Sequence, residues 1–166
     1  MDYINLRRSI RRYKSQEVSD ELIIKLLKSG MQAPSAVNQR PWFFVVTKNK
    51  DIINKLKEIS NGSKNIENAS CVIIPCMNKN NFKIEGMAPL DMSCSVENIL
   101  LKATELKLGS LWVGIYPKED RINKVKEILN LEDNLIPFNL IAIGYPMDNN
   151  DLKYIDRFEK ERIRFI

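Results

Sequence analysis

The stretch APSAVNQRPWFFVV, residues 33–46, joins a polar turn directly to a run of aromatic and β-branched residues. Pro34 and Pro41 bound the turn, and clusters of Pro, Ser and Asn are typical of loops. The run WFFVVT, residues 42–47, contains the residue types that favour a buried, pleated strand. The sequence therefore predicts a loop that leads straight into a strand.

The polar side chains of this turn allow two interpretations. They can satisfy the loop's own backbone, which is the ordinary role of such residues. They can also form a polar cradle for a flat heteroaromatic ligand with several carbonyls and ring nitrogens. The side chains concerned are Ser35, Asn38, Gln39 and Arg40.

Outward from this stretch, helical and strand patterns alternate along the chain. Helices are predicted over 18–33, 50–60, 91–109 and 118–131, and strands over 69–77, 110–117 and 137–146. In this pattern Ser19 caps the first helix, Pro75 closes the second strand and Gly109 stops the longest helix. No GxGxxG follows a strand, so a Rossmann site has no support. The pattern favours an α+β sandwich of helices around a central sheet.

Length and composition point to one ordinary globular domain over residues 1–166. No apolar run is long enough to cross a bilayer, and the first 14 residues lack the apolar stretch of a secretory signal, so we expect a cytoplasmic protein. The chain has no histidine, which excludes Ser-His and Cys-His nucleophile pairs, and it supplies zinc ligands poorly. We therefore expect no metal, and an enzyme of this composition needs imported chemistry.

The densest positive charge lies in RRSIRRYK, residues 7–14. If the segment is helical, Arg7 and Arg11 lie one turn apart, as do Arg8 and Arg12, and the charge gathers on one broad face. The arginine fork suits phosphate, and Ser9 adds a hydroxyl. A solvated basic face and a nucleic-acid arm are the other interpretations.

Three further positions are ambiguous from the residues alone. Trp112 is either a core residue or a ligand contact, and Gly114 marks either a bulge or a close approach of the backbone to a ligand. Cys94 lies in a helical region with no cation nearby in sequence, and we interpret it as a buried structural thiol.

Taken together and in order, five segments resemble the nitroreductase family of FMN-dependent oxidoreductases. They are RRSIRRY, APSAVNQRPWFFVV, SVENILLKATELKLGSLWVGIYP, IAIGYP and DRFEKERIRF. They cover most of the chain. The resemblance implies a sandwich with a central, mainly antiparallel sheet flanked by helices, and a homodimer in which C-terminal segments embrace the partner. The long apolar helix 91–108 is the natural interface element, although in a monomer the same face would serve as core.

The resemblance also implies which residues hold FMN. The first motif is similar to R-x-S-x-[RK], whose side chains clamp the FMN phosphate, and the WVG backbone of the family lies against the flavin. The second motif is similar to [AS]-P-[ST]-x-x-N-x-Q-P-W, which wraps the flavin ring from the partner subunit. The first set is Arg7, Arg8, Ser9 and Arg11 with Trp112, Val113 and Gly114, and the second is Pro34, Ser35, Ala36 and Asn38, closed by Pro41 and Trp42.

This sequence departs from the family pattern at two places. Arg40 stands where glutamine is common, with Gln39 one place earlier. Of a basic pair near the C-terminus, Arg157 matches, Ile155 does not, and Lys153 is the candidate to compensate.

The function implied is ping-pong hydride transfer. NADH or NADPH passes a hydride to FMN and leaves. A nitroaromatic, quinone or related small-molecule acceptor then takes the place of the nicotinamide and is reduced. The flavin carries the chemistry, so no side chain is named as catalytic. A flavin-binding module without efficient turnover is the alternative, and we expect neither a nucleic-acid nor a membrane partner.

Overall fold

The computed structural model of the protein describes residues 2–148 and 154–166. Within these residues a five-stranded sheet has the order β1-β2-β5-β3, with β4 also paired to β2, and its pairings are antiparallel. The strands are β1 (Trp42–Thr47), β2 (Cys71–Asn78), β3 (Gly109–Gly114), β4 (Leu135–Pro137) and β5 (Asn139–Gly144). The α-helices are α1 (Tyr3–Leu6), α2 (Asp20–Met31), α3 (Lys50–Leu56), α4 (Ala88–Glu105) and α5 (Glu119–Leu129). The α+β sandwich predicted from the sequence is confirmed.

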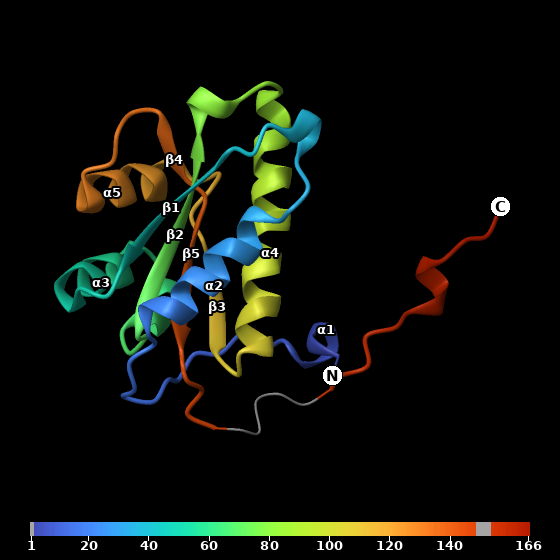
Figure 1. The fold of residues 1–166 in the computed structure, drawn as a ribbon, viewed down its shortest axis with the longest axis horizontal. Helices are drawn as coiled ribbons and strands as arrows, with labels where there is room; N and C mark the ends of the chain where they lie inside the picture. Colours follow the sequence, from blue (N-terminus) through green and yellow to red (C-terminus); the bar gives the residue numbers. More distant parts are fainter. Residues whose placement is uncertain (1, 149–153) are drawn as a thin grey trace.

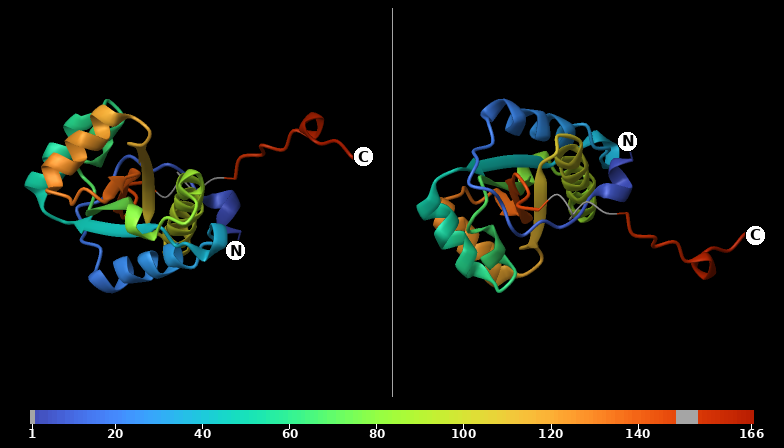
Figure 2. Two further views of the ribbon diagram at one scale, coloured as in Figure 1. Left: turned by 90° about the horizontal axis from the view of Figure 1, so that it is seen from above. Right: turned by 90° about the horizontal axis from the view of Figure 1, so that it is seen from below.

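Helices cover both faces of the sheet (Figures 1 and 2). One hydrophobic cluster joins the sheet to α3 and α5, and the other joins it to α2 and α4. Strand β5 contributes side chains to both clusters, because successive side chains of a strand point to opposite faces of the sheet. Leu140 lies in the first cluster and Ile141 in the second. This double burial explains why β5 is almost entirely apolar.

Strand β1 has the predicted bounds but not the predicted burial. It forms one edge of the sheet and pairs only with β2. Phe43 and Val46 consequently expose 43% and 37% of their surface. Aromatic and β-branched composition predicted the strand correctly, but it could not tell an edge from a centre.

The sequence predicted that Pro75 closes β2, but this is wrong. Pro75 lies inside the strand, opposite Phe44. The register against the neighbouring segment shifts by one residue between the Ile73–Ile141 and Cys76–Pro137 pairs. Pro75 lies at this break and accepts a hydrogen bond from the Phe138 N–H at 2.8 Å. A register break tolerates proline because one ladder N–H is not needed there.

The longest helix ends earlier than predicted, at Glu105 rather than beside Gly109. Lys107, with a φ of 59°, makes the left-handed turn that ends it, and Gly109 instead begins β3. A Cβ on Gly109 would lie 2.7 Å from the Ile10 side chain. Glycine is therefore needed at this position for close packing, not for stopping the helix.

The apolar face of α4 packs against the molecule's own sheet. Val96, Ile99, Leu100 and Ala103 are buried in the second cluster. The face that the sequence suggested for a subunit interface is therefore core within one chain. Cys94 points the other way and is exposed, so the prediction of a buried thiol there is wrong.

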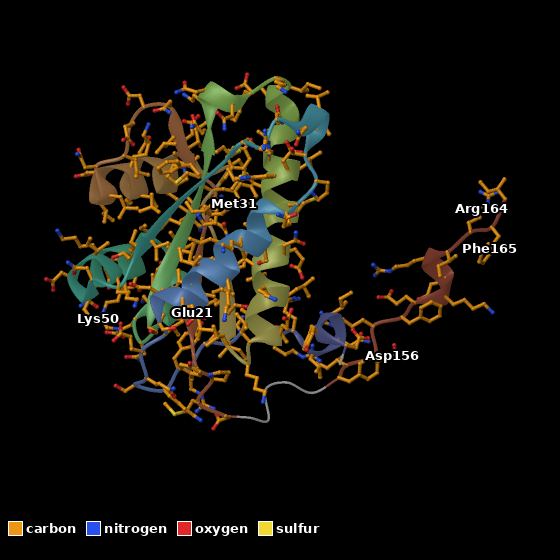
Figure 3. All side chains as sticks on the ribbon, in the orientation of Figure 1. Glu21, Met31, Lys50, Asp156, Arg164 and Phe165 are labelled. Atoms are coloured by element: carbon orange, nitrogen blue, oxygen red, sulfur yellow. The ribbon has the colours of Figure 1, made fainter. Side chains whose placement is uncertain are left out.

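The described part of the C-terminal segment, residues 154–166, extends away from the body of the molecule (Figures 1 and 2). The side chains of Asp156, Arg164 and Phe165 project well clear of the sheet and helices (Figure 3). Phe158 is 70% exposed and Phe165 is 94% exposed. Among the helices of the described residues, none has the length and apolarity needed to cross a membrane.

Candidate functional site

The arginine-rich segment is extended, not helical. It follows α1, which ends at Leu6, and runs along the edge of the sheet. The Ile10 N–H donates to the Ser110 carbonyl at 2.9 Å, and the Lys14 N–H donates to the Tyr145 carbonyl at 2.8 Å. Ile10 and Tyr13 are buried. These apolar anchors hold the backbone while the arginines between them remain on the outside.

The outward side chains enclose a cavity of about 490 Å³. Its lining is Arg8, Ser9, Arg11, Arg12 and Arg157. The structure thus brings together four of the residues predicted to bind phosphate, including one from the far end of the chain. Arg12 also contacts Asp148, so one of the four arginines is partly neutralised.

Arg8 is the most constrained member of this cavity. Its Nη1 donates to the carbonyls of Asn5 and Arg7 at 3.0 and 2.7 Å. Its Nη2 is buried and has no hydrogen-bond partner among residues 2–148 and 154–166. A buried, unpaired guanidinium nitrogen is costly unless an acceptor is supplied, and an anion would supply one.

Two of the basic residues predicted to bind the cofactor are not among the described residues that line the arginine cavity. The Nε of Arg7 lies 3.1 Å from Glu97 Oε1 on α4, and Arg7 is not among the residues that line the arginine cavity. Lys153, the candidate to compensate for Ile155, falls outside the described residues. Ile155 itself is 52% exposed.

Arg11 also lines a second cavity of about 520 Å³ at the edge of β3. The predicted residues Trp112, Val113 and Gly114 form one wall. The other walls come from Ile59, Ser60, Asn61, Gly62, Asn65, Leu111, Asp120 and Arg121. Since the two cavities share Arg11, they form adjoining parts of one basic surface.

Backbone groups of β3 face this second cavity. The Ser110 carbonyl points away from β5, because it accepts from Ile10. Alternate residues of an antiparallel strand share this direction, so Trp112 and Gly114 also turn their N–H and C=O groups outward. The Gly114 carbonyl accepts from Arg121 Nη1 at 2.8 Å. The N–H groups of Trp112 and Gly114 and the carbonyl of Trp112 remain directed at the cavity.

Neither backbone conformation nor packing against the described residues requires glycine at position 114. Its φ is not positive, and a Cβ built on it meets no atom of the described residues within 4 Å. A glycine beside open space allows a ligand to approach the backbone closely. This favours a close approach of the backbone to a ligand at Gly114 over a bulge.

The turn between Ala33 and Trp42 is held by hydrogen bonds to residues 83–84 and to Asp91 on α4. Gln39 is buried, and its Oε1 accepts from the N–H groups of Lys83 and Ile84 at 2.9 and 3.0 Å. Its Nε2 donates to Asp91 Oδ2 at 2.6 Å, and Asp91 Oδ1 accepts from the Ala36 N–H at 2.9 Å. Gln39 therefore serves neither the backbone of its own loop nor an open cradle, because its side chain ties the turn to residues 83–84 and to Asp91 on α4.

These hydrogen bonds hold an unusual backbone. Val37, Asn38 and Arg40 have φ values of 45°, 53° and 45°, and the left-handed region is unfavourable for a β-branched residue such as Val37. Ser35 Oγ accepts from the Arg40 N–H at 3.0 Å. The side chains of Val37, Asn38 and Arg40 are exposed. The turn is thus a fixed scaffold that presents these side chains outward.

The turn does not reach the two cavities of its own chain. It lies at the beginning of α4, whereas the arginine segment passes the other end of that helix (Figure 1). Within the described residues, the lining of both cavities includes neither Pro34, Ser35, Ala36, Asn38 nor Arg40. A small ligand held in these cavities would therefore not touch the turn of the same chain.

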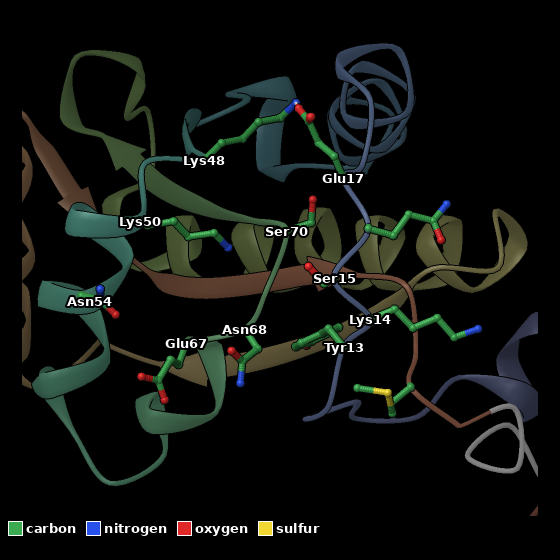
Figure 4. Close-up of a pocket in the computed structure, with 12 residues that line it drawn as sticks. Tyr13, Lys14, Ser15, Glu17, Lys48, Lys50, Asn54, Glu67, Asn68 and Ser70 are labelled. Carbon is green, nitrogen blue, oxygen red and sulfur yellow. The ribbon is translucent and has the colours of Figure 1, made fainter.

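A larger hollow of about 1030 Å³ lies between the N-terminal segment and α3 (Figure 4). None of the predicted site residues lines it. Lys48 Nζ lies 2.8 Å from Glu17 and 2.7 Å from Asp20, and Lys50 Nζ donates to the Ala69 carbonyl at 2.8 Å. Lys48 and Lys50 are thus already engaged, and the hollow also carries the carboxylates of Glu17 and Glu67, so it matches an anionic ligand less well than the arginine cavity does.

The buried cysteines do not contribute a nucleophile. Burial raises the pKa of the Cys71 and Cys76 thiols to about 12, so both remain protonated near neutral pH. In the part of the chain that the structure describes, no cluster of three or more Cys, Asp or Glu side chains is arranged to hold a metal ion.

Comparison with known proteins agrees with this geometry. The model of the Nitroreductase family matches residues 4–90 and 63–145. This chain belongs to the nitroreductase family. A candidate NADH dehydrogenase/NAD(P)H nitroreductase of Methanothermobacter thermautotrophicus is 39% identical over 163 residues, which are 98% of this chain and 84% of that protein.

Two solved structures superpose closely on the chain. A candidate NADH oxidase from Clostridium acetobutylicum has a TM-score of 0.94 at 44% identity, with 98% of each chain covered. A candidate nitroreductase from Desulfovibrio desulfuricans, solved in complex with FMN, has a TM-score of 0.83 at 28% identity and covers 97% of this chain and 92% of its own. The family resemblance expected from the sequence is confirmed.

Sequence reasoning missed part of the lining of the second cavity. Asn61 and Asn65 belong to the segment NGSKN, interpreted only as a loop, and Arg121 belongs to a helix interpreted only as amphipathic. The loop's Asn-Gly composition was the one available signal, but it is equally typical of any tight turn. Arg121 offered no signal, since its contact with Gly114 depends on how α5 packs beside β3.

Proposed function

We propose that this nitroreductase is an FMN-dependent oxidoreductase that uses NADH or NADPH to reduce nitroaromatic, quinone or related small-molecule acceptors. The observation that carries the proposal is the pair of adjoining cavities that share Arg11. One is lined by arginines and the other by an open strand edge. A cofactor with an anionic end and a flat polar ring matches both.

The arginine cavity suits the phosphate of FMN. Arg8, Ser9, Arg11 and Arg157 would hold it, with the buried Nη2 of Arg8 as the strongest indication that an anion belongs there. Arginine favours phosphate because its planar fork donates two parallel hydrogen bonds to it. Arg7 and Arg12, each beside a carboxylate, would contribute charge rather than direct contacts.

The second cavity suits the flavin ring. The outward N–H groups of Trp112 and Gly114 are donors for the polar edge of the ring, the Trp112 carbonyl is an acceptor, and Gly114 leaves room for close approach. FMN, when bound, supplies the hydride chemistry, and the protein positions it and tunes its potential. The chain's own residues bind and orient, and we assign none of them as an acid or base.

We further propose that the functional unit is a homodimer with C-terminal exchange. The turn residues Pro34, Ser35, Ala36 and Asn38, with Arg40 beside them, would complete the ring site of the other subunit, because they lie away from the cavities of their own chain. The exposed C-terminal segment carries apolar side chains that a partner would cover, among them Tyr154, Phe158, Ile163 and Phe165. The surface of Leu90, which is 58% exposed on α4, supports the same expectation.

One cavity for two reactants in turn favours ping-pong turnover. The nicotinamide donor and the acceptor would occupy the same ring site successively. The single domain over residues 1–166 and the cytoplasmic location stay predictions of the sequence.

The test is an absorbance titration of the purified protein with FMN, followed by anaerobic addition of NADH or NADPH and then of a nitroaromatic acceptor. We expect stoichiometric FMN binding, bleaching of the flavin by a nicotinamide and recovery of its colour with the acceptor. Bound flavin that no nicotinamide bleaches would instead indicate a binding module without turnover. A failure to bind FMN, with salt-sensitive binding of nucleic acid, would contradict the proposal.

A further inference from the structure

Arg121 occupies a position that its own helix does not favour. It lies in the first turn of α5, where Glu119 and Asp120 suit the positive end of the helix dipole. A cation at this end is disfavoured by the same dipole. Local helix stability therefore gives no reason for an arginine here, and its side-chain contact is the feature to explain.

That contact fixes the end of β3. Arg121 Nη1 donates to the Gly114 carbonyl at 2.8 Å, on the edge of β3 that faces away from β5. Gly114 is the last residue of β3 and has no side chain to anchor it. The guanidinium therefore holds the carbonyl of this last residue of β3 on the side that faces away from β5.

Both ends of the exposed edge are held in this way. The Ile10 N–H binds the Ser110 carbonyl at one end, and Arg121 binds the Gly114 carbonyl at the other. Between them lie the outward N–H groups of Trp112 and Gly114. Fixing both ends orients these two donors before a ligand arrives, which lowers the cost of ordering them on binding.

We propose that Arg121 is a positioning residue for the flavin: through the Gly114 carbonyl it holds the Trp112 and Gly114 N–H groups in line for the polar edge of the ring. The inference rests on the proposed function. Arg121 acts through the backbone, and its positive charge also lies at the cavity wall beside Arg11 and Asp120. Two cations against one carboxylate leave the wall net positive, which favours the reduced, more negative flavin.

The experiment compares Arg121→Met, Arg121→Lys and the matched control Lys124→Met. Lys124 is an exposed cation of the same helix and lies outside the two cavities. We measure the FMN dissociation constant, the midpoint potential of bound FMN and the thermal stability of flavin-free protein. Loss of one charge-assisted hydrogen bond predicts roughly tenfold weaker FMN binding for Arg121→Met. Its midpoint potential should be more negative than that of the wild type.

Lysine and the control variant define the remaining outcomes. Because a single hydrogen bond is involved, Arg121→Lys should restore most of the FMN affinity and the potential, and Lys124→Met should match the wild type in both. The inference is overturned if Arg121→Met binds FMN as the wild type does with an unchanged potential. It is also overturned if Arg121→Met only lowers the stability of the flavin-free protein, since that is a structural role.

Failure of the proposed function looks different. If wild-type protein binds no FMN, the proposed function fails and this inference fails with it. If the wild type binds FMN and is bleached by a nicotinamide while Arg121→Met behaves identically, only the role of Arg121 fails.

Discussion

The arginine-rich segment 7–14 and the turn 33–42 are both polar, and both resemble flavin-binding motifs, but the chain uses their side chains differently. In the turn, the Gln39 side chain is fully used in hydrogen bonds to the backbone of Lys83 and Ile84 and to Asp91. In the arginine segment, backbone bonds to the sheet edge and the buried Ile10 do the holding. The arginine side chains are consequently left to line a cavity.

The difference shows how an extended segment and a turn offer polar groups to a ligand. An extended segment docked on a sheet alternates inward and outward side chains, so its outward groups are available without further support. A turn with left-handed residues needs its own side chains to hold the backbone. Only the polar groups that remain after this internal use can serve a ligand.

We expect the largest effect from Gln39→Ala, which should lower the stability of the folded protein. The substitution leaves Asp91 and the N–H groups of Lys83 and Ile84 without their partner inside the protein. Asp91 is buried and keeps only its bond from the Ala36 N–H, whereas the two N–H groups are partly buried and can be partly solvated. Because an unpaired buried group costs about 1–3 kcal/mol, we expect a loss of about 3 kcal/mol of unfolding free energy in total. Urea denaturation at fixed protein concentration measures it. Arg40→Gln, in the same turn but exposed, should change the same quantity by less than about 0.5 kcal/mol.

The corresponding substitution in the arginine segment is Arg8→Ala. Here the effect should fall on the ligand: loss of a charge-assisted contact predicts about 2 kcal/mol, or roughly thirtyfold weaker FMN binding. Fluorescence titration with FMN measures it. Lys14→Ala, which removes an equal charge from the same segment but outside the arginine cavity, is the control. Equal losses in the two variants would mean that the segment acts only as a diffuse positive charge.

A smaller effect, of opposite sign, is expected at Val37. Its φ of 45° is strained for a β-branched side chain, and that side chain is 59% exposed. Glycine relieves the strain but loses more chain entropy on folding, so Val37→Gly should stabilise the protein by about 0.5 kcal/mol. Thermal unfolding of flavin-free protein measures the change. A clear loss of stability would mean that the Val37 side chain packs against something that one chain does not contain.

Much of the fold could be predicted because periodicity reports which side chains are buried. The run at 42–47 became β1 with the expected bounds, and Ser19 caps α2 through its hydroxyl as expected. Pro75 could not be placed correctly, because tolerance of proline there depends on a register break against residues 135–144. Local composition carries no information on such a break.

The candidate site was predictable where one segment contributes several residues. Arg8, Ser9 and Arg11 are close in sequence and lie together in the cavity. The role of Arg121 was not predictable. It lies seven residues after Gly114, and its contact with the Gly114 carbonyl depends on how the chain turns between β3 and α5. The buried role of Gln39 was equally hidden, because its partner Asp91 lies 52 residues along the chain.

The two contacts that hold β3 have a second consequence, for self-association. An exposed strand edge with free N–H and C=O groups is a template on which other chains aggregate. Ile10 occupies this edge at Ser110, and the Arg121 guanidinium occupies it at Gly114. The open stretch between them is too short for a foreign strand to extend along it. The same interruption that leaves room for a small planar molecule thus keeps the β3 edge of the sheet from pairing with a neighbouring sheet.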